Sequence, residues 1–276
     1  MKPTTLLSLL LLLLSCTTKP AENQTQANQE ETHRVLKPEF QALLDSANLD
    51  GAILIFDSES KSYYSNDFAW SERGQLPAST FKIPNGIIAL ETGVVENDSV
   101  LFAWDGEERA FKVWEQDLIF RDAFQVSCLP CFQEIARNIG VERMKAYLEK
   151  LDYGIIKFDS LTIDNFWVQG ESRINQFEQI DFLRRFYHSE LPISERTDTL
   201  MKSIMVIEEN ENYRISGKTG WSFSEENNNG WFVGYMESEG KVFFFATNLE
   251  PKDQSNIEGF ISARKNLTYK ALRMLN

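Results

Sequence analysis

The chain has 276 residues, of which 42% are hydrophobic and 12% aromatic, enough for a folded domain with a full apolar core. Its formal net charge of −13 argues against a nucleic acid as partner, because binding to phosphates requires a basic surface. Only two histidines occur, His33 and His188, and neither lies near a serine motif, so a Ser-His-Asp triad is not expected.

The N-terminus has the features of a secretion signal. Lys2 precedes a leucine-rich run that is too short to span a bilayer comfortably. This run ends in Leu13-Leu14-Ser15-Cys16, which resembles the lipobox of bacterial lipoproteins, in which the cysteine is lipidated and becomes the mature N-terminus. We therefore predict a signal peptide at residues 1–15, a lipid on Cys16, a disordered polar tether at residues 16–36 and a folded domain at residues 37–276. The protein is expected to be periplasmic and anchored to a bacterial membrane through Cys16.

Two strands and a buried helix are predicted in the first third of the folded domain. Residues 51–56 are apolar and are separated by a polar turn from Tyr63-Tyr64, a pattern that predicts a hairpin. The turn contains the S-x-x-K sequence Ser58 to Lys61, but nothing there would bury a lysine. Residues 79–91 then read as an apolar helix that ends near a glycine.

The rest of the chain predicts helices followed by strands. Helical patterns dominate residues 94–207. Residues 213–216, 230–237 and 241–247 read as strands, and residues 257–275 as an amphipathic helix. Strands near both ends with helices between them predict an α+β fold. Its sheet would be antiparallel, built from N- and C-terminal segments and flanked by helices, with a mainly helical second lobe.

Cys128 and Cys131 form a C-x-x-C sequence inside the helical region. Neither a second such pair nor a histidine cluster accompanies it, so a zinc site is not expected. Two readings remain open, a pair of buried thiols or a local disulfide, and both are favoured over thioredoxin-like redox catalysis.

Ser79-Thr80-Phe81-Lys82 carries the clearest chemistry in the chain. A serine nucleophile needs a base, and a lysine three residues later on a helix can reach back to the serine hydroxyl. The apolar residues that follow would bury Lys82 and lower its pKa toward neutrality. Free N–H groups at the helix start can stabilise an oxyanion. We therefore predict that Ser79 is the nucleophile.

Three motifs occur in the order typical of serine β-lactamases and penicillin-binding proteins: S-x-x-K at Ser79, a second serine at Ser127, and K-T-G at Lys218-Thr219-Gly220. Residues 77–85, the sequence Phe166-Trp167 and residues 230–234 resemble those of the class D β-lactamases, the oxacillinases. The resemblance extends over about residues 45–273 and implies a β-lactamase/transpeptidase-like catalytic domain that hydrolyses β-lactams.

The resemblance also implies a role for each catalytic residue. Ser79 would form the acyl-enzyme, and Lys82 would carry a carbamate made with carbon dioxide and act as general base. Trp167 would hold the carbamate through its indole N–H, and Ser127 would relay a proton to the lactam nitrogen. No metal and no cofactor other than carbon dioxide or bicarbonate is expected.

A second set of residues is implied to bind substrate. Lys218 and Thr219 would meet the substrate carboxylate, Arg264 would add a second cation, and the N–H groups of Ser79 and Trp221 would form the oxyanion hole. The predicted substrate-binding residues are Lys218, Thr219, Gly220, Trp221, Arg264, Val126 and Val168.

Two departures from the class and two alternative functions accompany this prediction. Ile155 stands where members usually have asparagine, and the Cys128/Cys131 pair is not a general feature of the class. Leu129, two residues after Ser127, stands where members usually have valine and preserves the apolar character. The alternatives are a β-lactam sensor domain and a penicillin-binding DD-peptidase, both acylated but slow to turn over. A single short signal without a signalling module weighs against the sensor, and the apolar Leu129 with the acidic surface weighs against the peptidase.

Overall fold

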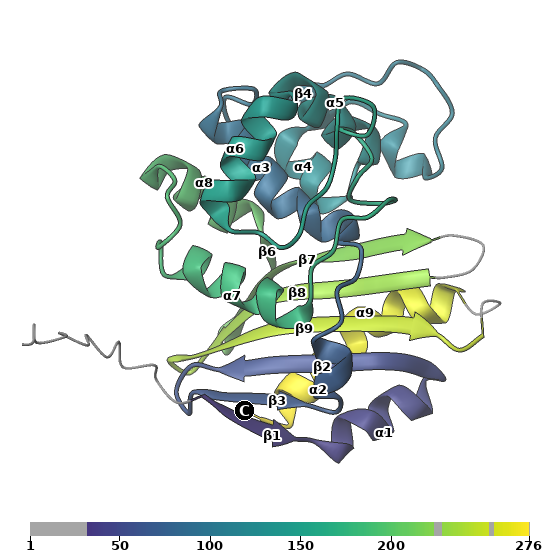
Figure 1. Ribbon diagram of the computed structural model, residues 1–276, viewed down its shortest axis with the longest axis vertical. Helices are drawn as coiled ribbons and strands as arrows, with labels where there is room; N and C mark the ends of the chain where they lie inside the picture. The colour runs from purple at the N-terminus through teal and green to yellow at the C-terminus, as the bar shows by residue number, and fades with distance from the viewer. Residues whose placement is uncertain (1–31, 224–227, 254–256, 276) are drawn as a thin grey trace, which may run out of the picture. The chain divides into compact units, whose positions relative to one another are not determined.

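The computed structural model describes residues 32–223, 228–253 and 257–275 (Figure 1). Its described residues form a seven-stranded sheet in the order β1-β3-β2-β9-β8-β7-β6, and a two-stranded ladder, β4-β5. The sheet strands are β1 (His33–Leu36), β2 (Leu49–Asp57), β3 (Ser62–Ser65), β6 (Val206–Glu209), β7 (Tyr213–Phe223), β8 (Asn228–Ser238) and β9 (Lys241–Pro251). Because β2 pairs with β9 antiparallel, N- and C-terminal segments share one sheet, which confirms the predicted fold class. The sheet is mixed rather than wholly antiparallel as predicted, because β1 pairs in parallel with β3.

The first strand corrects the predicted tether. The sequence places residues 33–36 in the disordered segment, whereas the structure pairs them in parallel with β3, His33 opposite Ser62 and Leu36 opposite Ser65. All four side chains of β1 are exposed, so the strand leaves no apolar pattern in the sequence. It is held by backbone pairing and by Arg34, which pairs with Glu72 at 2.7 Å and lies over the Phe177 ring. Residues 16–31 of the predicted tether lie outside the described residues.

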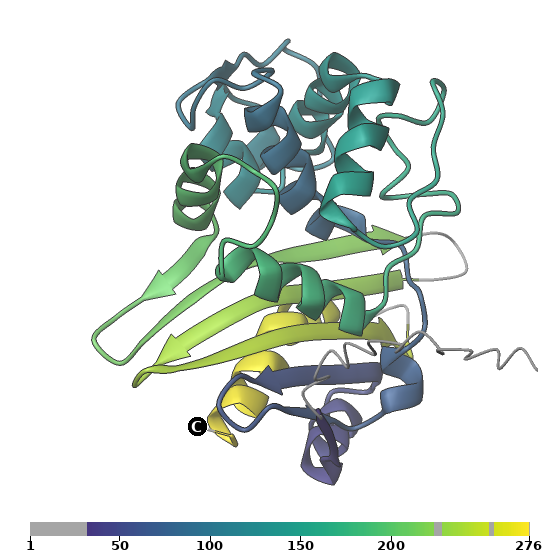
Figure 2. The same cartoon turned by 60° about the vertical axis from the view of Figure 1, so that its left-hand side comes forward.

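The two faces of the sheet are covered by different helices. Ile53 and Ile55 of β2 belong to a core with α1 (Pro38–Ser46) and α9 (Ile257–Arg273), whereas Leu54 and Phe56 point into the larger core with α7 (Gln176–Tyr187). This alternation follows from the two-residue period of a strand. Figures 1 and 2 show α7 and α9 on opposite faces of the sheet.

A helical lobe lies beside the β7 side of the sheet and surrounds α3 (Lys82–Glu91) (Figure 2). Residues 82–90 of α3 are all buried, the polar Lys82 and Asn85 among otherwise apolar side chains and Gly86. The other elements outside the large sheet are α2 (Phe68–Ser71), η1 (Ala78–Phe81), β4 (Leu101–Phe102), η2 (Lys112–Trp114), β5 (Leu118–Ile119), α4 (Phe120–Gln125), α5 (Leu129–Ile139), α6 (Val141–Leu151) and α8 (Glu195–Ile204).

The predicted hairpin and the predicted buried helix are both present, and each contains one of the two S-x-x-K sequences. The hairpin of β2 and β3 turns at residues 58–61, so the first S-x-x-K sequence lies in a surface turn. The second, Ser79 to Lys82, spans η1 and the start of the buried α3. Across the part of the chain that the structure describes, no helix is both long and apolar enough to cross a bilayer.

Candidate active site

Ser79 lies in η1, a tight turn fixed from several sides. Ala78 adopts φ +50°, a left-handed conformation that side chains rarely take, so the turn must be held by its surroundings. The Ala78 N–H donates to the Trp167 carbonyl at 2.7 Å, and the Thr80 hydroxyl donates to the Pro77 carbonyl at 2.6 Å. The first bond joins the serine turn to the loop that carries Trp167, and the second closes the turn itself.

Gly220 of β7 allows the strand to approach this turn. A Cβ built on Gly220 would lie 3.1 Å from Thr80 Cγ2 and 3.3 Å from the Ala78 Cβ, tighter than almost all such contacts. The glycine of K-T-G is therefore needed for close packing between β7 and η1. This close packing brings the backbone around Trp221 next to Ser79.

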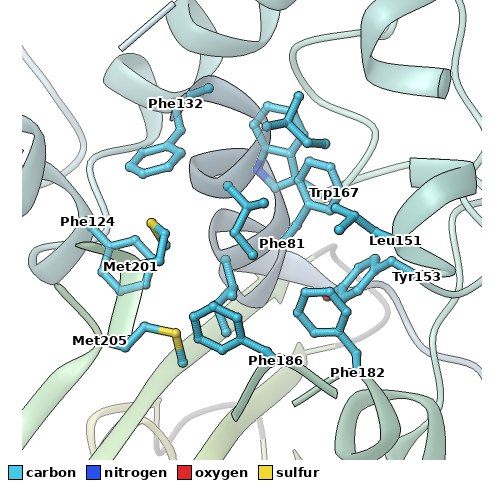
Figure 3. Close-up of a cluster of buried hydrophobic side chains, with 14 of the residues drawn as sticks. Phe81, Phe124, Phe132, Leu151, Tyr153, Trp167, Phe182, Phe186, Met201 and Met205 are labelled. Atoms are coloured by element: carbon cyan, nitrogen blue, oxygen red, sulfur yellow. The ribbon is translucent and has the colours of Figure 1, made fainter. Parts of the chain in front are cut away.

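Lys82 is fully buried behind Ser79, and its Nζ donates to the Ser79 Oγ at 3.0 Å. Burial lowers the pKa of Lys82 to about 7, because the apolar surroundings penalise the charged form. The Phe132 ring centroid lies 5.2 Å from Nζ, and the Phe81 ring stacks on Trp167 (Figure 3). Near neutral pH a large share of Lys82 is therefore an uncharged amine that can accept a proton.

Trp167 is buried completely within the same aromatic cluster. Its ring centroid lies 5.5 Å from that of Phe81, with the two planes nearly parallel. Its indole Nε1 is buried and has no hydrogen-bond partner among the described residues. An unpaired buried donor costs about 1–3 kcal/mol, so this N–H is a strong candidate for binding an acceptor.

Ser127 and Lys218 meet across the site from two different lobes. Ser127 follows α4 with φ +58°, and Lys218 extends from β7 to donate from Nζ to the Ser127 Oγ. Lys218 also donates to the Thr219 carbonyl at 3.1 Å. Burial, and then the positive charge of Lys82, hold the pKa of Lys218 well below its usual range. The lysine is thus poised to exchange a proton with Ser127 or to pair with an anion.

Arg264 reaches the site from α9 because Gly230 makes room for it. A Cβ on Gly230 would lie 2.8 Å from Arg264 Cδ and 2.4 Å from a ring carbon of Phe260. The Arg264 Nη1 donates to the Gly220 carbonyl, and Nε donates to the Ile261 carbonyl at 3.0 Å. Burial lowers the pKa of Arg264 to about 10, so the guanidinium stays charged at neutral pH.

A pocket of about 490 Å³ opens in front of Ser79. It is lined by eight of the predicted residues, namely Ser79, Val126, Ser127, Val168, Thr219, Gly220, Trp221 and Arg264. Lys82, Trp167 and Lys218 are absent from the lining, and all three are buried. The pocket therefore presents the nucleophile, the second serine and the arginine to a ligand.

Sequence reasoning missed several lining residues. Phe111, Trp114 and Phe223 form an aromatic part of the wall. The other lining residues that were missed are Ala110, Val113, Leu129, Gln169, Ser222 and Ile261. Phe111 and Phe223 are 45% and 72% exposed, so they have no buried pattern that could reveal them. Trp114 is joined to the site by a hydrogen bond. Its Nε1 donates to the Val126 carbonyl at 3.0 Å, next to the second serine.

Two sequence features are resolved by the structure. Cys128 and Cys131 form a disulfide, which selects one of the two readings left open above. Ile155, which replaces the usual asparagine, is 61% exposed and is not part of the pocket lining. Its backbone pairs with that of Arg173, with N–H to carbonyl distances of 2.8 and 2.7 Å. The Ile155 side chain therefore lies outside the wall of this pocket.

The geometry is that of a serine acyl-transfer site in which a buried lysine, rather than a histidine, contacts the serine hydroxyl. A family model described as the penicillin binding protein transpeptidase domain matches residues 19–272. Beta-lactamase OXA-10 of Pseudomonas aeruginosa is 43% identical over 212 residues, which cover 76% of this chain and 79% of that protein. Beta-lactamase OXA-48 of Klebsiella pneumoniae is 40% identical over 200 residues, covering 72% and 75%.

Solved structures agree with the sequence relatives. The class D β-lactamase YbXI from Nostoc superposes with a TM-score of 0.81 at 40% identity, covering 86% of this chain and 98% of that one. A class D β-lactamase from Sebaldella termitidis gives a TM-score of 0.84 at 34% identity, covering 89% and 98%. The chain therefore belongs to the class D serine β-lactamases, within the penicillin binding protein transpeptidase family, and the resemblance seen in its motifs is confirmed.

Proposed function

We propose that this protein hydrolyses β-lactam antibiotics through an acyl-enzyme on Ser79, with carbamylated Lys82 as general base. The observation that carries the proposal is the pairing of Ser79 Oγ with the buried Lys82 amine at 3.0 Å, in a site whose burial lowers the lysine pKa to about 7. A base with a pKa close to the working pH is the most effective in general base catalysis.

Acylation follows from the residues at the pocket. The base at Lys82 takes the Ser79 proton while Oγ attacks the lactam carbonyl, and the C–N bond of the ring then breaks. The N–H groups of Ser79 and Trp221 stabilise the oxyanion. The close packing of Gly220 against η1 brings these two N–H groups near each other. Ser127 passes a proton to the leaving nitrogen, and Lys218, which donates to Ser127 Oγ, supports this transfer.

Substrate binding uses the charged and polar groups of the pocket. Thr219 and Arg264 line it, and the guanidinium of Arg264 remains a cation at neutral pH. They meet the carboxylate that β-lactams carry, and the buried Lys218 amine adds an N–H donor behind them. Val126 and Val168 form apolar wall beside them.

The residues around Lys82 suit a carbamate. An uncharged amine loses one proton when its nitrogen bonds to carbon dioxide, and burial provides that uncharged form near neutrality. The product bears two oxygens that need donors, and the unpaired buried Nε1 of Trp167 is a donor only. The carbamate supplies a carboxylate-like base that activates water for deacylation.

The lifetime of the acyl-enzyme tests the proposed function. A chromogenic cephalosporin in excess should be turned over many times per active site after any initial burst. A single burst equal to the enzyme concentration would instead indicate a sensor or a DD-peptidase. Mass spectrometry of the intact protein at intervals measures the acyl-enzyme directly and separates slow acylation from slow release.

Replacing Trp167 by phenylalanine is expected to slow deacylation by about 10- to 100-fold, the factor that corresponds to a hydrogen bond to a charged group of about 1.5–3 kcal/mol. Phenylalanine preserves the stack on Phe81 but removes the N–H. Acylation should change less, so acyl-enzyme should accumulate in the mass spectrum. Trp104→Phe is the matched control, because its Nε1 donates to the Glu107 carbonyl outside the pocket lining. Equal deacylation in both variants would contradict the role of Trp167.

We also propose that the protein is a periplasmic lipoprotein, which rests on Leu13-Leu14-Ser15-Cys16 at the end of an apolar signal. In a bacterial host, Cys16→Ser is expected to move the protein from the membrane fraction to the soluble periplasmic fraction. Mass spectrometry should find acyl chains on the N-terminal peptide of the unchanged protein only. Soluble, unlipidated protein with Cys16 intact would contradict the proposal.

A further inference from the structure

The Cys128–Cys131 disulfide forms the N-terminal turn of α5, in the sequence Cys128-Leu129-Pro130-Cys131. Cys128 is the N-cap, and its Sγ accepts a hydrogen bond from the Cys131 N–H at 3.2 Å. The two cysteines are only 1% and 8% exposed. Burial this deep leaves little access for another protein and argues against disulfide exchange as a separate activity.

The disulfide-bonded turn connects three groups of the active site. Ser127 directly precedes it, Leu129 lies inside it and lines the pocket, and Phe132 directly follows it with its ring next to the Lys82 amine. The Phe132 carbonyl accepts a hydrogen bond from the Asn85 Nδ2 of α3 at 3.3 Å. The C-terminal end of the turn is therefore attached to the helix that carries Lys82.

Ser127 needs such support at the other end of the turn. Its φ of +58° is unfavourable for a residue with a side chain, and such a conformation persists only where neighbouring contacts enforce it. The Ser127 N–H donates to the Phe124 carbonyl at 3.1 Å, and the Cys128 N–H donates to the Ala123 carbonyl at 2.8 Å. The disulfide adds a covalent constraint one residue beyond this point.

We propose that the Cys128–Cys131 disulfide is a positioning element for acylation, which holds Ser127 Oγ against Lys218 and Leu129 in the pocket wall. The inference rests on the proposed function, because it concerns the proton transfer assigned to Ser127. Reduction by a dithiol breaks the S–S bond, transfers two electrons and two protons to give two thiols, and oxidises the reductant to its disulfide. It thereby releases the constraint and slows acylation while leaving Lys82 and Trp167 in place.

The test compares oxidised protein, protein reduced with dithiothreitol, and the variant C128S/C131A, all as the full chain. Serine keeps an N-cap acceptor for α5, so the variant removes the covalent bridge without removing the cap. Alkylation and intact mass establish the thiol count in each sample. The readouts are the rate and final extent of Ser79 labelling by a fluorescent penicillin, the carbon-13 signal of the Lys82 carbamate, and amide hydrogen exchange over residues 126–132.

Reduced protein and variant are expected to label about tenfold more slowly than oxidised protein, the scale of effect that a small misplacement of a reacting group produces. Labelling should still reach completion, the carbamate signal should be unchanged, and the amides of residues 126–132 should exchange faster. Dithiothreitol should have no effect on C128S/C131A, which excludes an effect through Cys16.

Labelling rates that are equal in the oxidised, reduced and variant proteins would overturn the inference. So would slower labelling with a proportional loss of final extent, because that pattern reports partial unfolding. If penicillin does not label the oxidised protein at all, the proposed function fails. In that case amide exchange over residues 126–132 is the remaining test of the positioning role. Unchanged exchange on reduction would contradict the role, and faster exchange would support it.

Discussion

Ser79→Ala is expected to abolish covalent labelling by penicillin and to lower β-lactam hydrolysis by at least about 10⁴-fold, the scale seen when a serine hydrolase loses its nucleophile. Ser79 Oγ is the oxygen that accepts the hydrogen bond from the buried Lys82 amine. Alanine removes this oxygen and leaves η1 and the pocket intact, so binding of intact β-lactam should persist. Mass spectrometry after incubation with penicillin measures the adduct, and a chromogenic cephalosporin measures turnover.

The chain supplies a matched control for this experiment. Ser58→Ala removes the serine of the other S-x-x-K sequence, which lies in the turn between β2 and β3. This variant should label and turn over at the unchanged rate. An adduct on the Ser79→Ala protein of the mass expected for acylation would disprove the assignment of the nucleophile.

Activity is expected to fall as the pH drops below 7 and to recover when bicarbonate is added. Burial lowers the pKa of Lys82 to about 7, so the uncharged amine predominates above that pH and is lost below it. At pH 6 only about a tenth of the free amine is uncharged and able to bond to carbon dioxide. At a limiting, fixed level of carbon dioxide the loss between pH 7.5 and pH 6 should therefore be about tenfold, and it should be much smaller with saturating bicarbonate. With carbon dioxide removed, turnover should be low at both pH values.

Turnover of a chromogenic cephalosporin in degassed buffer, with and without bicarbonate, at pH 6 and pH 7.5, measures this dependence. Added chloride at matched ionic strength controls for a salt effect, which exposed charges would show. Rates that are identical in all four conditions, from enzyme shown to be stripped of carbon dioxide, would leave an unmodified Lys82 as the base.

Those parts of the fold and site that depend on local pattern could be predicted from the sequence. The Ser79 and Lys82 side chains meet because they stand three positions apart at the start of a helix, and the apolar residues of α3 ensure that the lysine is buried. The β2–β3 hairpin follows likewise from two apolar runs around a polar turn. The remaining pocket residues came from motif resemblance, which carries information about contacts that are distant in sequence.

Features that depend on long-range packing could not be predicted. The pairing of Lys218 with Ser127 joins residues that are 91 positions apart, and no local pattern encodes it. The route of Arg264 past Gly230 requires the packing of α9 on β8. Phe111 and Phe223 lie on the exposed rim of the pocket, where residue type is weakly constrained by folding. Strand β1 is held by backbone pairing and by contacts of Arg34 with Glu72 and Phe177, which are distant in sequence, and its exposed side chains form no apolar pattern.

The most direct test of the account is carbon-13 NMR of the protein in labelled bicarbonate, because the central claim is that Lys82 carries a carbamate. The account predicts a carbamate resonance that is absent from Lys82→Ala, weaker in Trp167→Phe, and lost together with turnover when the pH falls below 7 without bicarbonate. Full turnover by enzyme that shows no such resonance would contradict it.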